Sequence, residues 1–231
     1  MKKNLLCILL IVFCSSFLFG QNFMNRIGDF KMYDSPSKLA ELGFTNPKQV
    51  RSKAEYTNMK FSNSKNNLYE IITDTINGDK FDDFQNYYNP QIKSFYFRSM
   101  EIAKDIILKN VRIIYYKDSL ISFTCYDSPQ VSRNMGLSKL EDIYTTKYGI
   151  KSTKEEKNTK ENSNTSTVSY ETSLPNITCF ISTKIYKYVY GKTTIIKSLN
   201  FYDKAKRIES QIEERHIEKR IKSKNSNYTN L

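Results

Sequence analysis

Only one histidine, His216, occurs among the 231 residues. A single histidine excludes metal sites that need two or three imidazoles, and it excludes the H-E-x-x-H protease motif. Catalysis by a Ser-His-Asp or Cys-His arrangement would have to use His216 itself. Its neighbours are charged, as on a solvated helix face: Glu214, Arg215, Glu218 and Arg220. The sequence therefore predicts no catalytic histidine.

The other catalytic and metal-binding motifs are incomplete. Serine followed three residues later by lysine occurs at residues 35–38 and 62–65, a spacing that activates a serine in penicillin-binding enzymes. Neither K-T-G nor S-D-N accompanies it, and no P-loop, G-x-G-x-x-G or G-x-S-x-G pattern occurs. Aligning Gly78 with the sixth position of a calcium loop places Phe84 where a closing carboxylate is required. We expect no catalytic residue, no metal site and no cofactor.

A row of tyrosines is the one pattern that suggests binding. Side chains alternate between the two faces of a strand, so residues of equal parity share a face. Four such residues are Lys184, Tyr186, Tyr188 and Tyr190. Tyrosines beside a cation form a platform on which sugar rings or bases can stack. The alternative is that a helix covers these tyrosines and makes them part of the core.

Two of the four cysteines are candidates for a disulfide. Cys7 and Cys14 lie in the apolar N-terminal segment, which is expected to be removed with the export signal. Cys125 and Cys179 remain in the mature chain. In an oxidising compartment these two would close a long loop, worth about 4 kcal/mol on the chain-entropy model. The alternative is a pair of separate buried thiols. The absence of C-x-x-C argues against thioredoxin-like redox chemistry and zinc knuckles.

Residues 1–20 have the pattern of a cleaved export signal. Lys2 and Lys3 precede an apolar run at residues 5–13, and a small residue, Gly20, precedes the expected cut. A cut after Ser16 is the alternative. The sequence therefore predicts a periplasmic or extracellular protein that has no transmembrane domain once the signal is removed.

Two other interpretations of this segment remain. A lipoprotein would be anchored through Cys14, but Phe13 stands where the lipid-attachment motif requires a small side chain. An uncleaved membrane anchor is the third interpretation. Both would keep the protein at the cell envelope.

The chain is strongly basic. Its net charge of +12 becomes +10 when Lys2 and Lys3 leave with the signal. An exported basic protein meets anionic lipid, acidic polysaccharide and extracellular nucleic acid. However, Lys, Asn, Ile, Tyr and Phe are also the residues that AT-rich codons encode. An AT-rich genome therefore yields proteins of high pI without selection for binding. An anionic envelope polymer or another envelope protein is the expected partner, and no motif points to nucleic acid.

Hairpins and helices alternate along the mature chain. Apolar alternation predicts long hairpins at residues 111–126 and 177–202. Between them, a capping box at residues 138–141 predicts a helix that ends at Gly149, with Leu140, Ile143, Tyr144 and Tyr148 on one stripe. Residues 151–167 contain no apolar side chain, which predicts a flexible polar loop.

These elements predict an α+β fold: an antiparallel sheet built from long hairpins, with helices packed on one face and a charged C-terminal helix. We expect a single domain at residues 21–205. Residues 206–231 are expected to form the charged helix and a frayed tail from residue 225. The apolar seam of this helix would be Ile208, Ile212, Ile217 and Ile221.

The predicted function is that of an exported, non-enzymatic binding or cell-envelope accessory protein. Its support is the signal, the missing catalytic constellation and the tyrosine row. The first alternative is an exported hydrolase that uses two carboxylates on cell-wall or polysaccharide substrates, although nothing selects a pair. The second alternative is an interaction module that works through the C-terminal helix.

Overall fold

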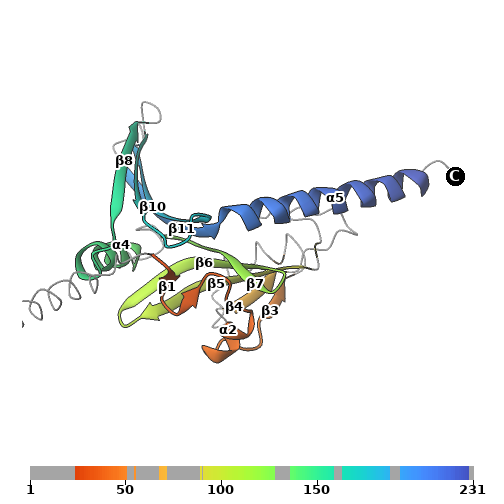
Figure 1. Cartoon of the computed structure of the whole chain (residues 1–231), viewed down its shortest axis with the longest axis horizontal. Coiled ribbons are helices and arrows are strands. Elements are labelled where there is room, and N and C mark those ends of the chain that lie inside the picture. Colours follow the sequence, from red (N-terminus) through yellow and green to blue (C-terminus); the bar gives the residue numbers. More distant parts are fainter. Residues whose placement is uncertain are drawn as a thin grey trace, which may run out of the picture.

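The computed structural model describes residues 24–50, 55, 68–71, 89, 91–127, 136–158, 163–187 and 193–228. The predicted signal, residues 1–20, lies outside these ranges. Within them, strands predominate and a few helices accompany them, so the α+β fold class is confirmed (Figure 1). None of the described helices is both long and apolar enough to cross a membrane.

One large sheet forms the body of the protein. Its strands are β3 (Lys48–Val50), β4 (Leu68–Ile71), β5 (Ile92–Ala103), β6 (Ile106–Tyr116), β7 (Ser119–Asp127), β8 (Ser152–Asn158), β9 (Ser163–Tyr170), β10 (Ile177–Lys187) and β11 (Thr193–Asp203). Their order is β3-β4-β5-β6-β7-β11-β10-β9-β8. The β3–β4 pair is parallel and the others are antiparallel, so the sheet is mixed.

The sheet twists strongly between its two halves. In Figure 1, β5 to β7 lie nearly flat, whereas β8 to β10 rise steeply from them. A small hairpin of β1 (Arg26–Ile27) and β2 (Phe30–Lys31) and the short helix α2 (Ser37–Glu41) lie along the lower half. The helix α4 (Gly136–Asp142) continues into the π-helix η1 (Ile143–Lys147) beside the rising strands.

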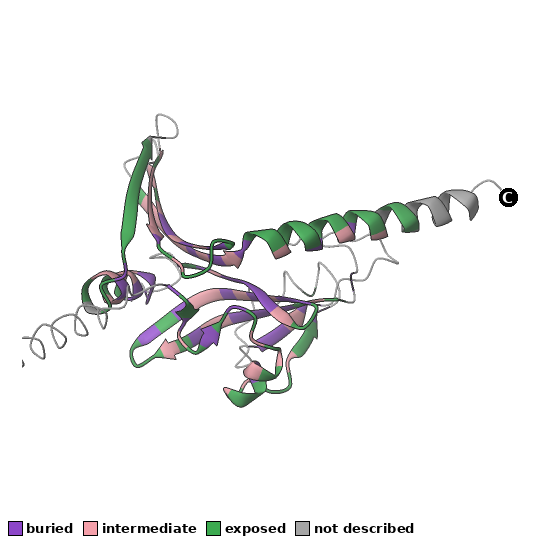
Figure 2. Ribbon diagram, in the orientation of Figure 1, coloured by how far each residue is buried: buried purple, intermediate pink, exposed green. Residues whose placement is uncertain are grey.

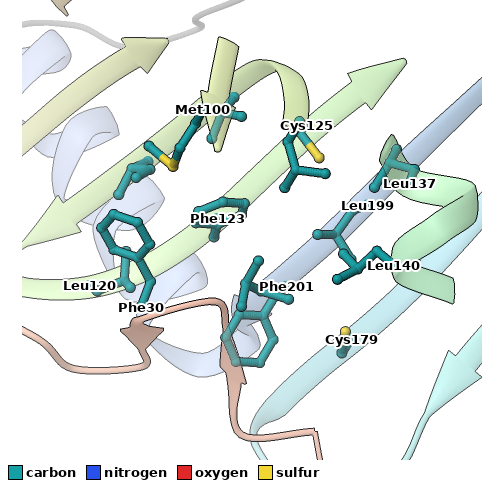
Figure 3. Close-up of a cluster of buried hydrophobic side chains, with 14 of the residues drawn as sticks. Phe30, Met100, Leu120, Phe123, Cys125, Leu137, Leu140, Cys179, Leu199 and Phe201 are labelled. Atoms are coloured by element: carbon teal, nitrogen blue, oxygen red, sulfur yellow. The ribbon is translucent and has the colours of Figure 1, made fainter. Parts of the chain in front are cut away.

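One face of the sheet carries the main hydrophobic core. In the close-up of Figure 3, Leu137 and Leu140 of α4 lie against strand residues that include Leu199 and Cys179. Phe30 of β2 packs on Phe123, with ring centroids 5.6 Å apart. Alternation along the strands places apolar residues on this face, and this explains why the sequence predicted both long hairpins.

A register shift in the first hairpin changes part of its predicted pattern. The β6–β7 pairing is irregular between Ile114 and Tyr115, opposite Ile121. Phe123 and Cys125 face the core, as the alternation of residues 111–126 indicates. Ile121 is buried, but it lies outside the main core cluster, since the extra residue breaks the alternation at this point.

The predicted polar loop is wrong. Most of residues 151–167 form β8 and the first half of β9, which pair with each other and extend the sheet. β8 has no apolar side chain, and all of its residues with described side chains are exposed (Figure 2). Main-chain hydrogen bonds to β9 hold it, and its own charged side chains pair along the strand, as Lys154 does with Glu156 at 2.8 Å. Charges on an edge strand also discourage pairing with another chain.

The long helix α5 (Lys204–Tyr228) follows β11 directly, and its C-terminal half extends beyond the strands (Figure 1). Helix therefore continues to Tyr228, into the tail that was expected to fray. Asp203 precedes α5 and caps it, because its Oδ1 accepts a hydrogen bond from Lys206 N at 2.9 Å. Its other oxygen accepts a hydrogen bond from the Tyr33 hydroxyl at 2.5 Å.

The charged C-terminal helix, which was predicted separately from the helices on the core face, packs on the other face of the sheet. Tyr115 faces the main core, so its neighbour Tyr116 faces the opposite side of the sheet. The Tyr116 hydroxyl donates to Glu213 of α5 at 2.8 Å, and Lys117 pairs with Glu209 at 2.7 Å. α5 thus lies on the side of the sheet opposite to α4.

The four isoleucines of α5 do not form one seam. Ile208 and Ile217 are nine residues apart, which is two and a half turns at 3.6 residues per turn, so they lie on opposite sides of the helix. Ile208 and Ile212 are each 49% exposed, whereas Ile217 is half-buried. The side toward the sheet is largely polar and includes the buried residues Ser210 and Glu214.

Candidate ligand-binding site

A cavity of about 560 Å³ opens where three parts of the chain meet. These parts are the β1–β2 turn, the β5–β6 turn and the α4–η1 helix. Residues that line it are Met24, Asn25, Arg26, Gly28, Asp29, Ile102, Ala103, Lys104, Ile106, Leu140, Ile143, Tyr144, Tyr148 and Ile150. Its volume lies within the range of roughly 300–1,000 Å³ that is typical of small-molecule sites.

The helical wall of the cavity is irregular. Tyr148 N donates to Ile143 O and Ile150 N donates to Tyr144 O, both at 3.0 Å. These bonds span five and six residues, wider than the four of an α-helix, and all four residues line the cavity. π-turns of this kind occur frequently at functional sites. Gly149, with φ of +57°, then ends the helix as predicted.

This helix begins earlier than the sequence indicates. Its first residue is Gly136, so Ser138 lies inside the helix and the predicted capping box does not form. The side chain of buried Asp127 supplies the acceptor instead, since its Oδ2 accepts a hydrogen bond from Gly136 N at 3.0 Å. The predicted stripe is confirmed at the buried residues Leu140 and Tyr144, whereas Tyr148 is 47% exposed at the cavity.

The opposite wall is held close to β5 by a glycine. Gly28 has a φ of +57°, and a Cβ at this position would lie 3.0 Å from Ile102 Cβ and from Ile102 O. Met24 N donates to Glu171 O at 2.7 Å, and the Asn25 side chain accepts hydrogen bonds from Ser173. These contacts fix the β1–β2 turn over the cavity.

Three charged side chains lie among the lining residues, and all three are exposed. They are Arg26 on β1, Asp29 in the β1–β2 turn and Lys104 in the β5–β6 turn. Within the described part of the chain, neither cation is in an ion pair. An apolar interior with a net positive mouth therefore characterises the cavity.

Tyr144 separates the cavity from the core. It is buried, and its hydroxyl has no hydrogen-bond partner among the described residues. Burial, with a smaller contribution from the nearby Cys179, raises the pKa of Tyr144 far above its usual range. The neighbouring Tyr170, whose ring centroid is 5.8 Å away, has its pKa raised by burial in the same way. Both phenols are therefore neutral, which is unsuitable for a general base near neutral pH.

Cys125 and Cys179 both point into the main core, but they are free. Cys125 lies opposite Leu199, and Cys179 lies opposite Phe201, so β11 separates their strands. Two strand spacings amount to about 9–10 Å, too far for a disulfide. The candidate disulfide between Cys125 and Cys179 is therefore wrong. Burial raises the pKa of both thiols well above the usual range, which makes them unreactive.

The predicted tyrosine row is described only in part. Lys184 is exposed and Tyr186 is half-buried, and both lie on the face opposite to Cys179 and Ile181. Tyr188 and Tyr190 lie outside the described residues. A shallow hollow of about 250 Å³ lies on the same face of the rising strands, lined by Glu155, Lys157, Thr165, Thr167, Ser169 and Phe180. Neither Lys184 nor Tyr186 belongs to its lining.

The described residues hold no metal-binding cluster, and the single histidine lies away from the cavity. No group of three or more His, Cys, Asp or Glu side chains could hold a metal ion in this part of the chain. His216 is exposed on α5, away from the cavity lining. Asp29 is the one carboxylate among the residues that line the cavity.

Sequence reasoning did not find the cavity. Its only signal was the helical stripe from Leu140 to Tyr148, which is equally typical of a core helix. Arg26 and Lys104 belong to turns far apart in the sequence, and nothing in their local pattern marks them. Comparison of the chain with protein-family models, curated proteins and solved structures gives no match. The site's geometry therefore stands without support from relatives.

Proposed function

We propose that the chain is an exported, non-enzymatic binding protein of the cell envelope that holds a small, largely apolar molecule in the cavity beside η1. The observation that carries the proposal is the cavity itself. It combines a volume typical of ligand sites with apolar walls from three separate elements and an irregular π-turn.

The N-terminal sequence supports the export half of the proposal. Two lysines precede an apolar run, and small residues follow at the expected cleavage positions. The polar edge strand β8 and the basic composition suit an envelope location, where anionic polymers and lipids are abundant.

Export predicts a defined mature terminus. N-terminal sequencing of the protein recovered from the producing cells should begin at Gln21, or at Phe17 if cleavage follows Ser16. Recovery of an intact Met1 terminus from a membrane fraction would contradict cleavage. A lipid on Cys14 would show instead that the protein is anchored as a lipoprotein.

Filling the cavity should weaken binding without unfolding the protein. Ala103 is exposed and lines the cavity, so A103W places an indole in the opening. The probe is N-phenyl-1-naphthylamine, a neutral apolar dye whose fluorescence rises in dry surroundings. We expect saturable binding to the unmodified protein and an affinity at least about tenfold lower in A103W, a loss of about 1.4 kcal/mol.

The matched control is A205W, which adds the same ring at an exposed position on α5 outside the cavity lining. It should bind the dye as the unmodified protein does. Circular dichroism should show that both variants are folded. Absence of saturable dye binding, or equal binding by A103W, would contradict the proposed function.

A further inference from the structure

The proposed function leaves the class of ligand open. The charged residues at the mouth of the cavity indicate which class it is. We infer that the cavity binds an anionic amphiphile, a single apolar chain that ends in a carboxylate or a phosphate. This inference rests on the proposed function, since it assigns chemistry to the same cavity.

The apolar part of the ligand follows from the walls. Aliphatic and aromatic side chains form most of the lining and come from every element around the cavity. They are Met24, Ile102, Ile106, Leu140, Ile143, Tyr144, Tyr148 and Ile150. Moving an alkyl chain from water into such surroundings is favourable, and the gain grows with each CH₂ group that is buried. A sugar or a free phosphate would lose its hydration there without comparable contacts.

The anionic end follows from the two cations. Arg26 and Lys104 belong to different elements, yet both line the same cavity, and the structure gives neither an ion-pair partner in the described chain. Arginine presents a planar fork of donors that fits carboxylate or phosphate oxygens, and lysine adds a compact charge. Asp29 opposes only one of these two charges, so an anionic group is favoured at the opening.

The position of the charges also fits an amphiphile better than a uniformly apolar ligand. All three charged side chains are exposed, whereas Leu140, Tyr144, Ile106 and Ile150 are buried. A ligand that places its head in solvent beside Arg26 and its chain against these buried residues satisfies both parts of the site. A neutral hydrocarbon would leave the two cations unused.

The test compares ligands that share one chain and differ in the head group. Oleate, monooleyl phosphate and oleyl alcohol are titrated at pH 8 below their micelle concentrations, with displacement of N-phenyl-1-naphthylamine as the readout. We expect the unmodified protein to bind at least one of the two anions about tenfold or more tightly than the alcohol. The anion that binds more tightly, oleate or monooleyl phosphate, identifies carboxylate or phosphate as the preferred head group.

Charge removal then assigns the preference to residues. R26Q combined with K104Q should lower the affinity for the preferred anion to that of oleyl alcohol and leave the alcohol's affinity unchanged. The control combines R215Q with K48Q, which removes the same charges at exposed positions outside the cavity lining. It should keep the preference for the anion.

The outcomes separate this inference from the proposed function. Equal affinities for the anions and the alcohol in the unmodified protein, or an unchanged preference in the R26Q and K104Q double variant, would overturn the anionic ligand. The cavity would remain the binding site in both cases if A103W still weakens binding. Binding of all three ligands by A103W would overturn the proposed function as well.

Discussion

Replacing Gly136 by alanine should destabilise the protein by at least about 3 kcal/mol. A Cβ at this position would lie 2.1 Å from Ile107 O and 2.8 Å from Ile107 C. Both atoms belong to the backbone of β6, which is paired with β5 at this point, where Ile107 lies opposite Glu101, and has little freedom to move. G136A must therefore displace α4 from the core that Leu137 and Leu140 complete.

Helix propensity alone predicts the opposite sign. Alanine is more favourable than glycine inside a helix by about 1 kcal/mol, so an exposed helix would gain stability from the change. The sign of the measured effect therefore tests the close approach of α4 to β6 directly. Urea unfolding followed by circular dichroism provides the measurement.

G43A is the matched control for this experiment. Gly43 has a φ of +81°, but a Cβ there would meet no atom within 4 Å. Its replacement should cost only the strain of a left-handed alanine, about 1–2 kcal/mol. If G136A unfolds at the same urea concentration as the unmodified protein, the packing of α4 on Ile107 is not as described.

The parts of the sheet that bury apolar residues could be predicted from the sequence, and the polar parts could not. In the second hairpin, Ile177, Cys179 and Ile181 alternate with outward residues, and all three are buried. β8 shows no such alternation of buried apolar residues. It is held by main-chain hydrogen bonds to β9, and its side chains face solvent. Hydrophobic alternation carries no information about a strand of this kind.

The long helix shows a second limit of pattern reasoning. A helix that packs on a sheet normally does so with its apolar stripe, so four isoleucines suggested one seam. Here, Ile208 and Ile212 face away from the sheet, and carboxylates of α5 bind Tyr116 and Lys117 instead. Tertiary hydrogen bonds determine which side is buried, and they depend on residues about 90 positions earlier in the chain.

The candidate site was the least predictable feature. A cavity depends on where elements from different parts of the chain leave space, and no local spacing encodes that. The helical stripe that contains Tyr144 was visible in the sequence, but the π-turn that follows Asp142 was not. Gly28 and Gly136 allow the chain to approach Ile102 of β5 and Ile107 of β6 closely. Nothing in the sequence around these two glycines indicates those contacts.

The stability of the protein should fall as the pH rises from about 5 to 8, because of Glu214. This residue is buried on the sheet side of α5, and its Oε1 has no hydrogen-bond partner in the described structure. Burial raises the pKa of Glu214 from 4.5 to about 7, and the charge of Arg112 on β6 opposes the shift only in part. The folded protein therefore holds a proton at this site that the unfolded chain releases.

The sign follows from this difference in pKa. Below the unfolded pKa of about 4.5, both states carry the proton and the site contributes fully to stability. As the pH rises through the folded pKa of about 7, deprotonation of the buried group removes that contribution, up to about 3 kcal/mol. E214Q mimics the protonated form, so it should equal the unmodified protein near pH 4.5 and exceed it in stability at pH 8.

Glu209 on the same helix provides a control of opposite sign. Hydrogen bonds from Lys117 and Tyr116 lower the pKa of Glu209, so E209Q should lose stability at neutral pH and recover relative to the unmodified protein in acid. Urea midpoints at pH 3, 4.5, 6 and 8 for the three proteins decide the matter, because the Glu209 contribution is lost only below pH 4.5. A stability difference between E214Q and the unmodified protein that does not change with pH would show that Glu214 is not buried against the sheet. The opposite trends of the two variants would instead show that α5 docks through its carboxylates, with one held neutral by burial and one held ionised by Lys117.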